Sequence, residues 1–269
     1  MKKIIAILLA LVLVLAFAGC GAKETASTGS DNQSSADNTA ATVTTVKAGK
    51  LTMATNAYFQ PYEYYDGDKI VGIDAEIAAA IAEKLGLELE IQDMAFDSII
   101  TAVQEGSVDI GLAGMTVKPD RLEKVDFSIS YANGVQVVIV PENSAITTVD
   151  DLFADGATYK AGVQLGTTGD AYASEDLGSD RVTQYPNGNE AVNALLGGDV
   201  DCVIIDNEPA KSFVANNEGL KILETTYADE DYAACIKKGN KALLEAVDKA
   251  IDELMSDGTI DGIIAKYIK

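Results

Sequence analysis

Short apolar runs alternate with stretches of helical pattern between residues 50 and 114. The segments "KLTMAT", "LELEIQDM" and "VDIGLAG" have the alternating or continuous apolar composition of strands. The stretches between them have the pattern of amphipathic helices. This β-α-β-α-β order predicts a parallel sheet covered by helices. Strands are expected at 50–55, 87–94 and 108–114, and helices at 74–85 and 98–105.

Both helices carry signals for their ends. Asp74 and Asp97 stand where a side-chain oxygen can cap a helix N-terminus. Gly86 and Gly106 follow the last apolar position of each helix and are expected to end it.

A second set of alternating elements follows Tyr131. The segment "NEAVNALLGGDVDCVIID" repeats the order of "SIITAVQEGSVDIGLAG", a helix, a glycine, Val-Asp and a buried strand. This faint repeat predicts two similar α/β lobes. Strands are expected at 134–140, 160–165, 200–206 and 231–238, and helices at 148–153, 189–198, 207–217, 241–257 and 259–267, with one more helix after "GTTGD" (166–170).

The composition excludes some functions. The 269 residues include 42 acidic and 20 basic side chains, no His and no Trp, and the net charge is −22. Nucleic acid is not an expected partner, because binding it requires a basic surface. Without His, the usual general base, metal ligand and pH switch is missing. No metal and no cofactor are expected.

The N-terminus has the pattern of a signal peptide at 1–19. Lys2 and Lys3 precede an apolar run that ends at Ala18. As a helix the run would be roughly 23 Å long, too short for a bilayer core of about 30 Å.

The residues after this run resemble a lipoprotein anchor. The sequence "LAFAGCGAK" places small residues before Cys20, as in bacterial lipoproteins, with Phe17 where Leu is usual. Alternatively, Ala-Phe-Ala is an ordinary cleavage site that leaves Cys20 free. The segment 20–46 is expected to be the lipid-anchored Cys and a flexible linker of small polar residues. Lipidation would hold the protein at the outer face of the cell membrane, or in the periplasm.

The two other cysteines stand in apolar runs, Cys202 in "VDCVIID" and Cys235 in "YAACIKK". An exported protein can form a disulfide. Buried free thiols fit the apolar surroundings better.

Residues that follow the expected strands are candidates for a ligand site, because ligands of open α/β sheets bind beyond the carboxyl ends of strands. The stretch "NAYFQPYEYYDG" (56–67) follows the first strand and is rich in aromatic residues. Each candidate also has a structural interpretation: the aromatic residues as core, Asp206 as a helix cap, "GTTGD" as a plain turn and Arg121 as a surface cation.

Together these candidates form a site for a zwitterion. Arg121 can hold a carboxylate in a bidentate manner. The N–H groups of Thr116 and of Thr167–Thr168, the latter at an expected helix N-terminus, can donate to the same carboxylate. An ammonium group needs an acid and a carbonyl, which Asp206 and Gly114 can supply. The aromatic rings of Phe59 and Phe96 can enclose an aliphatic or amide side chain.

Residues 50–269 resemble the bacterial extracellular solute-binding proteins, family 3, the amino-acid-binding proteins of ABC importers. The resemblance rests on five segments in the family's order: "TNAYFQPYEY", "GIDAEIAAAIAEKLG", "FDSIITAVQEGSVDIGLAGMTVKPDRLEKVDFS", "VQLGTT" and "DCVIIDNEPA". It implies an α/β, two-lobed, periplasmic-binding-protein-like fold whose lobes are joined by two crossover strands.

The resemblance also implies where the lobes divide. The crossovers are expected near Tyr131–Val135 and Asp229–Tyr232. Lobe 1 would then comprise 47–130 plus 233–269, and lobe 2 would comprise 136–228.

The family's binding roles can be carried to matching positions. Arg121 would grip the α-carboxylate with Thr116 and Thr168, and Asp206 would take the α-ammonium with the Gly114 carbonyl. The ligand side chain would meet Asn56, Phe59, Glu63, Phe96 and Gln164.

The identity of the amino acid depends on this last group. Asn56 stands where many relatives have Asp, and Asn cannot neutralise a buried cation. We therefore expect a neutral polar amino acid, glutamine or cystine, ahead of arginine and lysine. Against this, Glu63 could reach a cation.

The expected function is capture of an amino acid and its delivery to an ABC permease by a monomer, without catalysis. The same fold also hosts enzymes resembling cyclohexadienyl dehydratase and ligand sensors, and an adhesin or structural lipoprotein is a third alternative.

Overall fold

A computed structural model describes residues 43–224 and 226–268, which belong to one compact unit. The expected signal peptide, Cys20 and the linker up to residue 42 lie outside these residues. They therefore remain predictions.

Helices and strands alternate along most of the described chain. The helices are α1 (Ile73–Lys84), α2 (Phe96–Glu105), α3 (Pro119–Leu122), the 3-10 helix η1 (Val149–Phe153), α4 (Thr168–Leu177), α5 (Gly188–Gly197), α6 (Asn207–Asn216), α7 (Lys241–Ser256) and α8 (Thr259–Tyr267). The strands are β1 (Lys50–Thr55), β2 (Tyr58–Phe59), β3 (Glu63–Asp66), β4 (Lys69–Val71), β5 (Glu88–Asp93), β6 (Ile110–Gly111), β7 (Val125–Pro141), β8 (Ala161–Gln164), β9 (Val182–Tyr185), β10 (Cys202–Asp206), β11 (Leu220–Ile222) and β12 (Ala228–Lys237).

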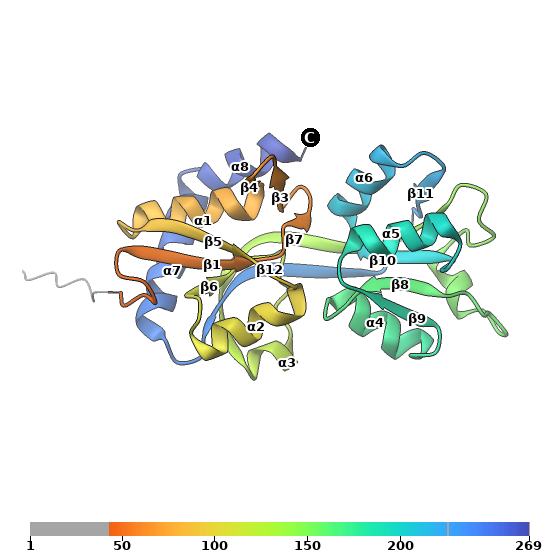
Figure 1. The fold of residues 1–269 in the computed structure, drawn as a ribbon, viewed down its shortest axis with the longest axis horizontal. Coiled ribbons are helices and arrows are strands. Elements are labelled where there is room, and N and C mark those ends of the chain that lie inside the picture. Colours follow the sequence, from red (N-terminus) through yellow and green to blue (C-terminus); the bar gives the residue numbers. More distant parts are fainter. Residues whose placement is uncertain (1–42, 225, 269) are drawn as a thin grey trace, which may run out of the picture. The chain divides into compact units, whose positions relative to one another are not determined.

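In each lobe, parallel strands are covered by helices on both faces, as the sequence predicts, and the antiparallel strands β7 and β12 join them into one mixed sheet (Figure 1). In the first lobe, β5 and β6 flank β1 and run parallel to it. In the second lobe, β9 and β10 flank β8 and run parallel to it. Helices α1 and α8 lie on one side of the first sheet and α2 on the other, and α5 and α4 take the same places in the second lobe.

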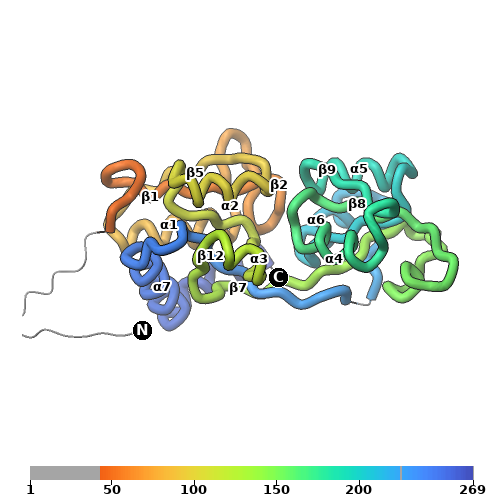
Figure 2. Tube along the Cα trace, turned by 90° about the horizontal axis from the view of Figure 1, so that it is seen from below, coloured from red at the N-terminus to blue at the C-terminus, as the bar shows by residue number. Residues whose placement is uncertain are grey.

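Two long antiparallel strands join the lobes. β7 has 17 residues and β12 has 10, and both run from one lobe into the other (Figures 1 and 2). In the middle of these strands Tyr232 pairs with Ala132, and Asp229 with Val135. The segments 131–135 and 229–232, in which we expected the crossovers, therefore lie beside each other.

The expected strand 134–140 is not the first parallel strand of the second lobe. It is the end of β7, which pairs antiparallel with β10. β7 runs antiparallel to β10 because it enters the second lobe directly from the first, with no helix before it in that lobe.

Both expected N-caps are wrong. Asp74 and Asp97 lie inside the first turns of α1 and α2, and neither helix has a side-chain cap. The Asp74 carboxylate instead accepts hydrogen bonds from the Gly114 N–H and the Tyr131 hydroxyl, which lie outside the helix. For Asp74, these hydrogen bonds to a distant loop and strand replace the expected cap of its own helix.

Some elements were shorter than expected or absent from the sequence prediction. β6 covers two residues of the expected strand 108–114, because the chain turns at Gly114, where φ is +52°. The small sheet β2–β3–β4, the short helix α3 and the strands β9 and β11 were not predicted. Most of them are too short to show a periodic pattern.

Alternating side chains along the strands build separate apolar layers on the two faces of the sheets. Leu51 and Met53 of β1 pack in the cluster that contains α1 and α7, whereas Ala54 packs with α2. In β7, Ile139 joins the α5 side and Val138 the opposite side with α4. Each lobe therefore has a core on both faces of its sheet.

Cys202 and Cys235 are both buried free thiols, as predicted. Each is fully enclosed in a different apolar cluster. Within the described part of the chain, no helix has the length and hydropathy needed to cross a bilayer.

Candidate functional site

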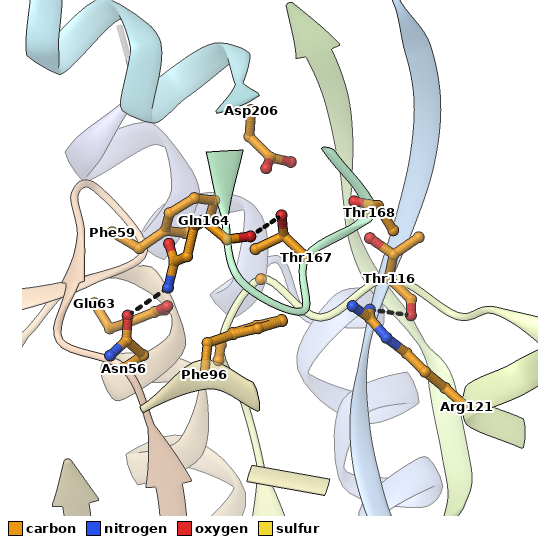
Figure 3. A pocket seen from close by; sticks show the side chains of 12 residues that line it. Asn56, Phe59, Glu63, Phe96, Thr116, Arg121, Gln164, Thr167, Thr168 and Asp206 are labelled. Atoms are coloured by element: carbon orange, nitrogen blue, oxygen red, sulfur yellow. Dashed lines mark hydrogen bonds between the residues drawn. The ribbon is translucent and has the colours of Figure 1, made fainter. Parts of the chain in front are cut away.

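One pocket brings together all ten residues that the sequence predicts as ligand contacts (Figure 3). Ala113 and Thr167 complete its lining, and its empty space is about 310 Å³, which includes open solvent at its mouth. The ten predicted residues are Asn56, Phe59, Glu63, Phe96, Gly114, Thr116, Arg121, Gln164, Thr168 and Asp206.

The ends of strands and the starts of helices hold these side chains. Asn56 directly follows β1, and Gln164 and Asp206 are the last residues of β8 and β10. Phe96 and Thr168 are the first residues of α2 and α4. Because the carboxyl ends of parallel strands lie at one edge of a sheet, residues far apart in sequence meet there.

Arg121 is a buried cation rather than a surface one. Its residue is 5% exposed, and its guanidinium donates to the carbonyl oxygens of Thr116 (2.8 Å) and Gly166 (3.1 Å). The guanidinium carbon lies 5.5 Å from the centre of the Phe96 ring. Burial lowers the pKa of Arg121. Among the described residues no carboxylate lies within 4.0 Å of it, so its charge has no ionic partner.

Two backbone N–H groups beside Arg121 are free to donate. α4 begins at Thr168, and the Thr167 hydroxyl caps it by accepting from the Asp170 N–H at 3.1 Å. The N–H groups of Thr116 and Thr168 have no acceptor among the described residues. A helix N-terminus with a free N–H beside a cation is favourable for an anionic group.

Asp206 supplies a buried carboxylate at the other side of the pocket. It occupies the N-cap position of α6 but makes no capping bond. Its oxygens accept from Gln136 Nε2 (2.8 Å) and from the Tyr232 hydroxyl. Burial and then the nearby charge of Glu230 raise the pKa of Asp206 well above its usual range. A cation placed beside it would therefore stabilise its ionised form.

Gly114 allows the chain to pass close to the aromatic wall. A Cβ atom at Gly114 would lie 2.7 Å from Phe59 Cε1, and φ is +52° there. Phe59 and Glu63 face each other across the β2–β3 pair, so their side chains share the face that lines the pocket. The small sheet thus supplies two of the predicted contacts.

Asn56 and Gln164 are paired with each other. Gln164 Nε2 donates to Asn56 Oδ1 at 2.9 Å, and Asn56 Nδ2 donates to the Met94 carbonyl at 2.8 Å. This bond joins the two lobes across the pocket (Figure 3).

Glu63 is different, because nothing among the described residues satisfies it. It is 0% exposed, and neither carboxyl oxygen has a hydrogen-bond partner. Burial and then the charge of Asp74 raise its pKa well above the usual range. A buried polar group without a partner is unfavourable, so it indicates a group that a ligand completes.

Sequence reasoning missed four residues that support the site, Asp74, Gln136, Glu230 and Tyr232. Gln136 Nε2 donates to Asp206 and to Glu230 Oε2 (3.0 Å), which also accepts from the Thr116 hydroxyl at 3.0 Å. One signal was available: Gln136 is a polar residue inside the apolar run "GVQVVIV".

The described residues contain no group of three His, Cys, Asp or Glu side chains arranged to hold a metal ion.

Comparison with known proteins places this fold and pocket in a family. Residues 51–269 match the model of the bacterial extracellular solute-binding proteins, family 3. The chain is 30% identical to the arginine-binding extracellular protein ArtP of Bacillus subtilis (strain 168), over 99% of this chain and 98% of that protein.

Solved structures agree. An ancestral arginine-binding protein bound to glutamine has a TM-score of 0.77 and 38% identity, over 82% of this chain and 99% of that one. An ancestral arginine-binding protein bound to arginine has a TM-score of 0.76. The ancestral amino-acid-binding protein AncCDT-1, described as a precursor of cyclohexadienyl dehydratase, has a TM-score of 0.75 and 30% identity, over 82% of this chain and 96% of that one.

Proposed function

Because the chain belongs to the bacterial extracellular solute-binding proteins, family 3, we propose that it captures a free amino acid outside the cytoplasm and delivers it to an ABC permease. The observation that carries this proposal is one pocket that holds a buried carboxylate and a buried guanidinium with no ionic partner among the described residues. An amino acid offers the complementary charge to each.

The α-groups of the ligand have defined partners in this proposal. Arg121 and the free N–H groups of Thr116 and Thr168 bind the α-carboxylate. Asp206 and the Gly114 carbonyl bind the α-ammonium.

We further propose that the ligand is arginine. Figure 3 places Arg121 and Glu63 on opposite sides of the pocket, so a ligand held at Arg121 can extend its side chain towards Glu63. Glu63 is buried without a partner, and a guanidinium can donate to both of its oxygens. The rings of Phe59 and Phe96 line the pocket between them. Relatives described as arginine-binding support this choice.

This proposal reverses the preference for a neutral ligand that Asn56 indicated. The Asn56 amide already has two partners, because Gln164 donates to its oxygen and its NH₂ donates to the Met94 carbonyl, whereas Glu63 has no partner among the described residues. The charge that a ligand must complete is therefore at Glu63.

Competition calorimetry with arginine, lysine, histidine, glutamine and cystine tests the ligand. We expect arginine to bind at least about tenfold tighter than every neutral competitor. Glu63→Gln should weaken the affinity for arginine by about a hundredfold or more, because it removes one partner of a buried ion pair. It should change the affinity for glutamine by less than about threefold.

Glu123→Gln is the matched control, since Glu123 is exposed and does not line the pocket. It should leave both affinities unchanged. A neutral amino acid that binds tighter than arginine would refute the ligand and leave the family function standing.

We propose no reaction at this site. Arginine incubated with the protein should be recovered chemically unchanged, as mass spectrometry can show. A new product would instead favour the dehydratase-like alternative.

The anchor remains part of the proposal. Lipidation of Cys20 would tether the protein to the membrane that holds the permease, and the "LAFAGCGAK" sequence supports it. The mass of the mature native protein decides between a lipidated Cys20 and an unmodified N-terminus.

A further inference from the structure

Two neighbouring carboxyl groups beneath the pocket share three unsatisfied oxygens. Glu63 and Asp74 are both 0% exposed. In the described part of the chain, neither oxygen of Glu63 has a hydrogen-bond partner, and Asp74 Oδ1 has none either. Asp74 Oδ2 is well satisfied, because it accepts from the Gly114 N–H at 2.8 Å and the Tyr131 hydroxyl at 2.7 Å. The Asp74 N–H donates to the carbonyl oxygen of Tyr62 at 2.9 Å, which places Asp74 beside the residue that precedes Glu63.

Two adjacent buried carboxyl groups cannot both be ionised at low cost. One proton between them would satisfy the free oxygen of Asp74, as the Glu63 O–H would donate to Asp74 Oδ1. The proton belongs on Glu63, because two donors stabilise the charge of Asp74 and none stabilises that of Glu63. Burial raises the pKa of Asp74 only to about 6, whereas that of Glu63 is raised well above its usual range.

Among the described residues, no cation pairs with Glu63 from the elements that surround it. The titratable groups that act on it or respond to its charge are acids and phenols: Asp74 of α1, Asp93 at the end of β5, Asp206 at the end of β10, Tyr62 before β3 and Tyr131 of β7. Arg121, the cation that lines the pocket, lies on the opposite side. A cation for Glu63 must therefore come with the ligand.

We propose that Asp74 is a specificity-determining residue that holds a proton on Glu63, so that capture of a cationic side chain expels this proton and capture of a neutral amino acid does not. The proposal rests on the proposed function of the pocket. In proton balance, the neutral Glu63 acid and a guanidinium ligand give a Glu63 carboxylate paired with the guanidinium, and the proton passes to the buffer. Asp74 touches no ligand and acts through Glu63.

The sign of the pH dependence follows from this exchange. Arginine binds the ionised form of Glu63, so its affinity should rise with pH by up to about tenfold per pH unit while the free Glu63 is protonated. Both arginine and glutamine bring an α-ammonium to Asp206, so a proton released there cancels in the comparison. The ratio of arginine to glutamine affinity should therefore rise with pH.

Calorimetry in two buffers of different ionisation enthalpy measures the protons released. Near pH 6, we expect the full-length protein to release about one proton more with arginine than with glutamine. Asp74→Asn should reduce this extra proton release, because its carbonyl can still accept from Gly114 and Tyr131 while its NH₂ can donate to an ionised Glu63. Arginine affinity should then vary less with pH than it does in the parent protein.

Asp93→Asn is the matched control, because it removes a nearby negative charge that accepts from the Ala57 N–H and the Tyr65 hydroxyl instead. It should keep the extra proton. Equal proton release with arginine and glutamine in the parent protein would overturn the proposal, as would an unchanged extra proton in Asp74→Asn. If Asp74→Asn fails to fold, equal proton release with arginine and glutamine on the parent protein still overturns the proposal. Absence of any heat with arginine would refute the proposed ligand itself, which is a different result.

Discussion

At the residue scale, Arg121 carries a positive charge inside the protein with only neutral partners among the described residues. Its guanidinium donates to two carbonyl oxygens, which orient it without neutralising it. The centre of the Phe96 ring lies 5.5 Å from the guanidinium carbon. A carboxylate from outside the chain is the group that would complete this arrangement.

We expect Arg121→Ala to weaken amino-acid binding by roughly a hundredfold to several thousandfold, because it leaves the ligand carboxylate buried without its partner. Arg121→Lys should also bind poorly, since an ammonium cannot replace the planar fork. Calorimetry measures both. Arg181→Lys is the control, as the other arginine of the chain donates to Tyr159 and Leu152 away from the pocket. Binding by Arg121→Ala within about threefold of the parent would contradict the assignment.

The sequence could predict which residue types face the pocket, because strand ends can be located from the apolar pattern and ligands bind beyond them. It could not predict that Asp74 accepts hydrogen bonds from Gly114 and Tyr131 instead of capping its helix, since those partners are distant in sequence. The pairing of Asn56 with Gln164 was equally hidden. As a result, the neutral character of Asn56 was visible from the sequence and the unsatisfied state of Glu63 was not.

At the scale of elements, the crossover strands connect the two halves of the site. Gln136 of β7 bridges two buried carboxylates, Asp206 at the end of β10 and Glu230 of β12. Glu230 also accepts from the hydroxyl of Thr116, whose carbonyl orients Arg121. One amide in the crossover therefore links the proposed ammonium site to the proposed carboxylate site.

We expect Gln136→Leu to weaken arginine binding by about 10- to 100-fold, the usual effect of losing a buried hydrogen bond to a charged group. Without this donor, Asp206 stays protonated more readily and binds the ammonium less well. Calorimetry at neutral pH measures the affinity, and thermal denaturation shows how much stability is lost. Asn133 lies on the same strand as Gln136 and makes an exposed hydrogen bond to Asp231 of β12. Asn133→Ala removes this bond and should bind arginine normally. Equal affinity of Gln136→Leu and Asn133→Ala would exclude the bridge from the site.

Most parallel strands and most helices of both lobes could be predicted from periodicity, because each buries an apolar face, whereas the parallel strand β9 buries none and was missed. The crossover strand β7 could not, because its direction is set by the other lobe. The sheet β2–β3–β4 was missed because its tyrosines are only partly buried and show no clear alternation. Irregular stretches of this kind supply Phe59 and Glu63 to the pocket.

At the scale of the whole molecule, buried acids couple folding to pH. Burial raises the pKa of Glu63 and Asp206 well above the usual range, and that of Asp74 from 3.8 to about 6. The folded state therefore binds more protons than the unfolded state, so folding is most stable below the unfolded pKa of about 4 and loses stability as pH rises through the folded values. For Asp74, this shift in pKa corresponds to a loss of about 3 kcal/mol in the free energy of unfolding as the pH rises.

We therefore expect the melting temperature of the ligand-free protein to fall between about pH 5 and about pH 8. The net charge of −22 acts in the same direction through self-repulsion. Saturating arginine should reduce the fall, because it pairs the ionised Glu63 and Asp206. Differential scanning calorimetry measures this, and a melting temperature that rises over the same range would contradict it.

A crystal structure of the protein grown with arginine shows most directly where the two ends of the ligand lie. We expect the α-carboxylate on Arg121 and the Thr168 N–H, the α-ammonium on Asp206, and the guanidinium against both oxygens of Glu63. Arginine bound in the reverse orientation, or only at a site outside this pocket, would contradict the proposed function.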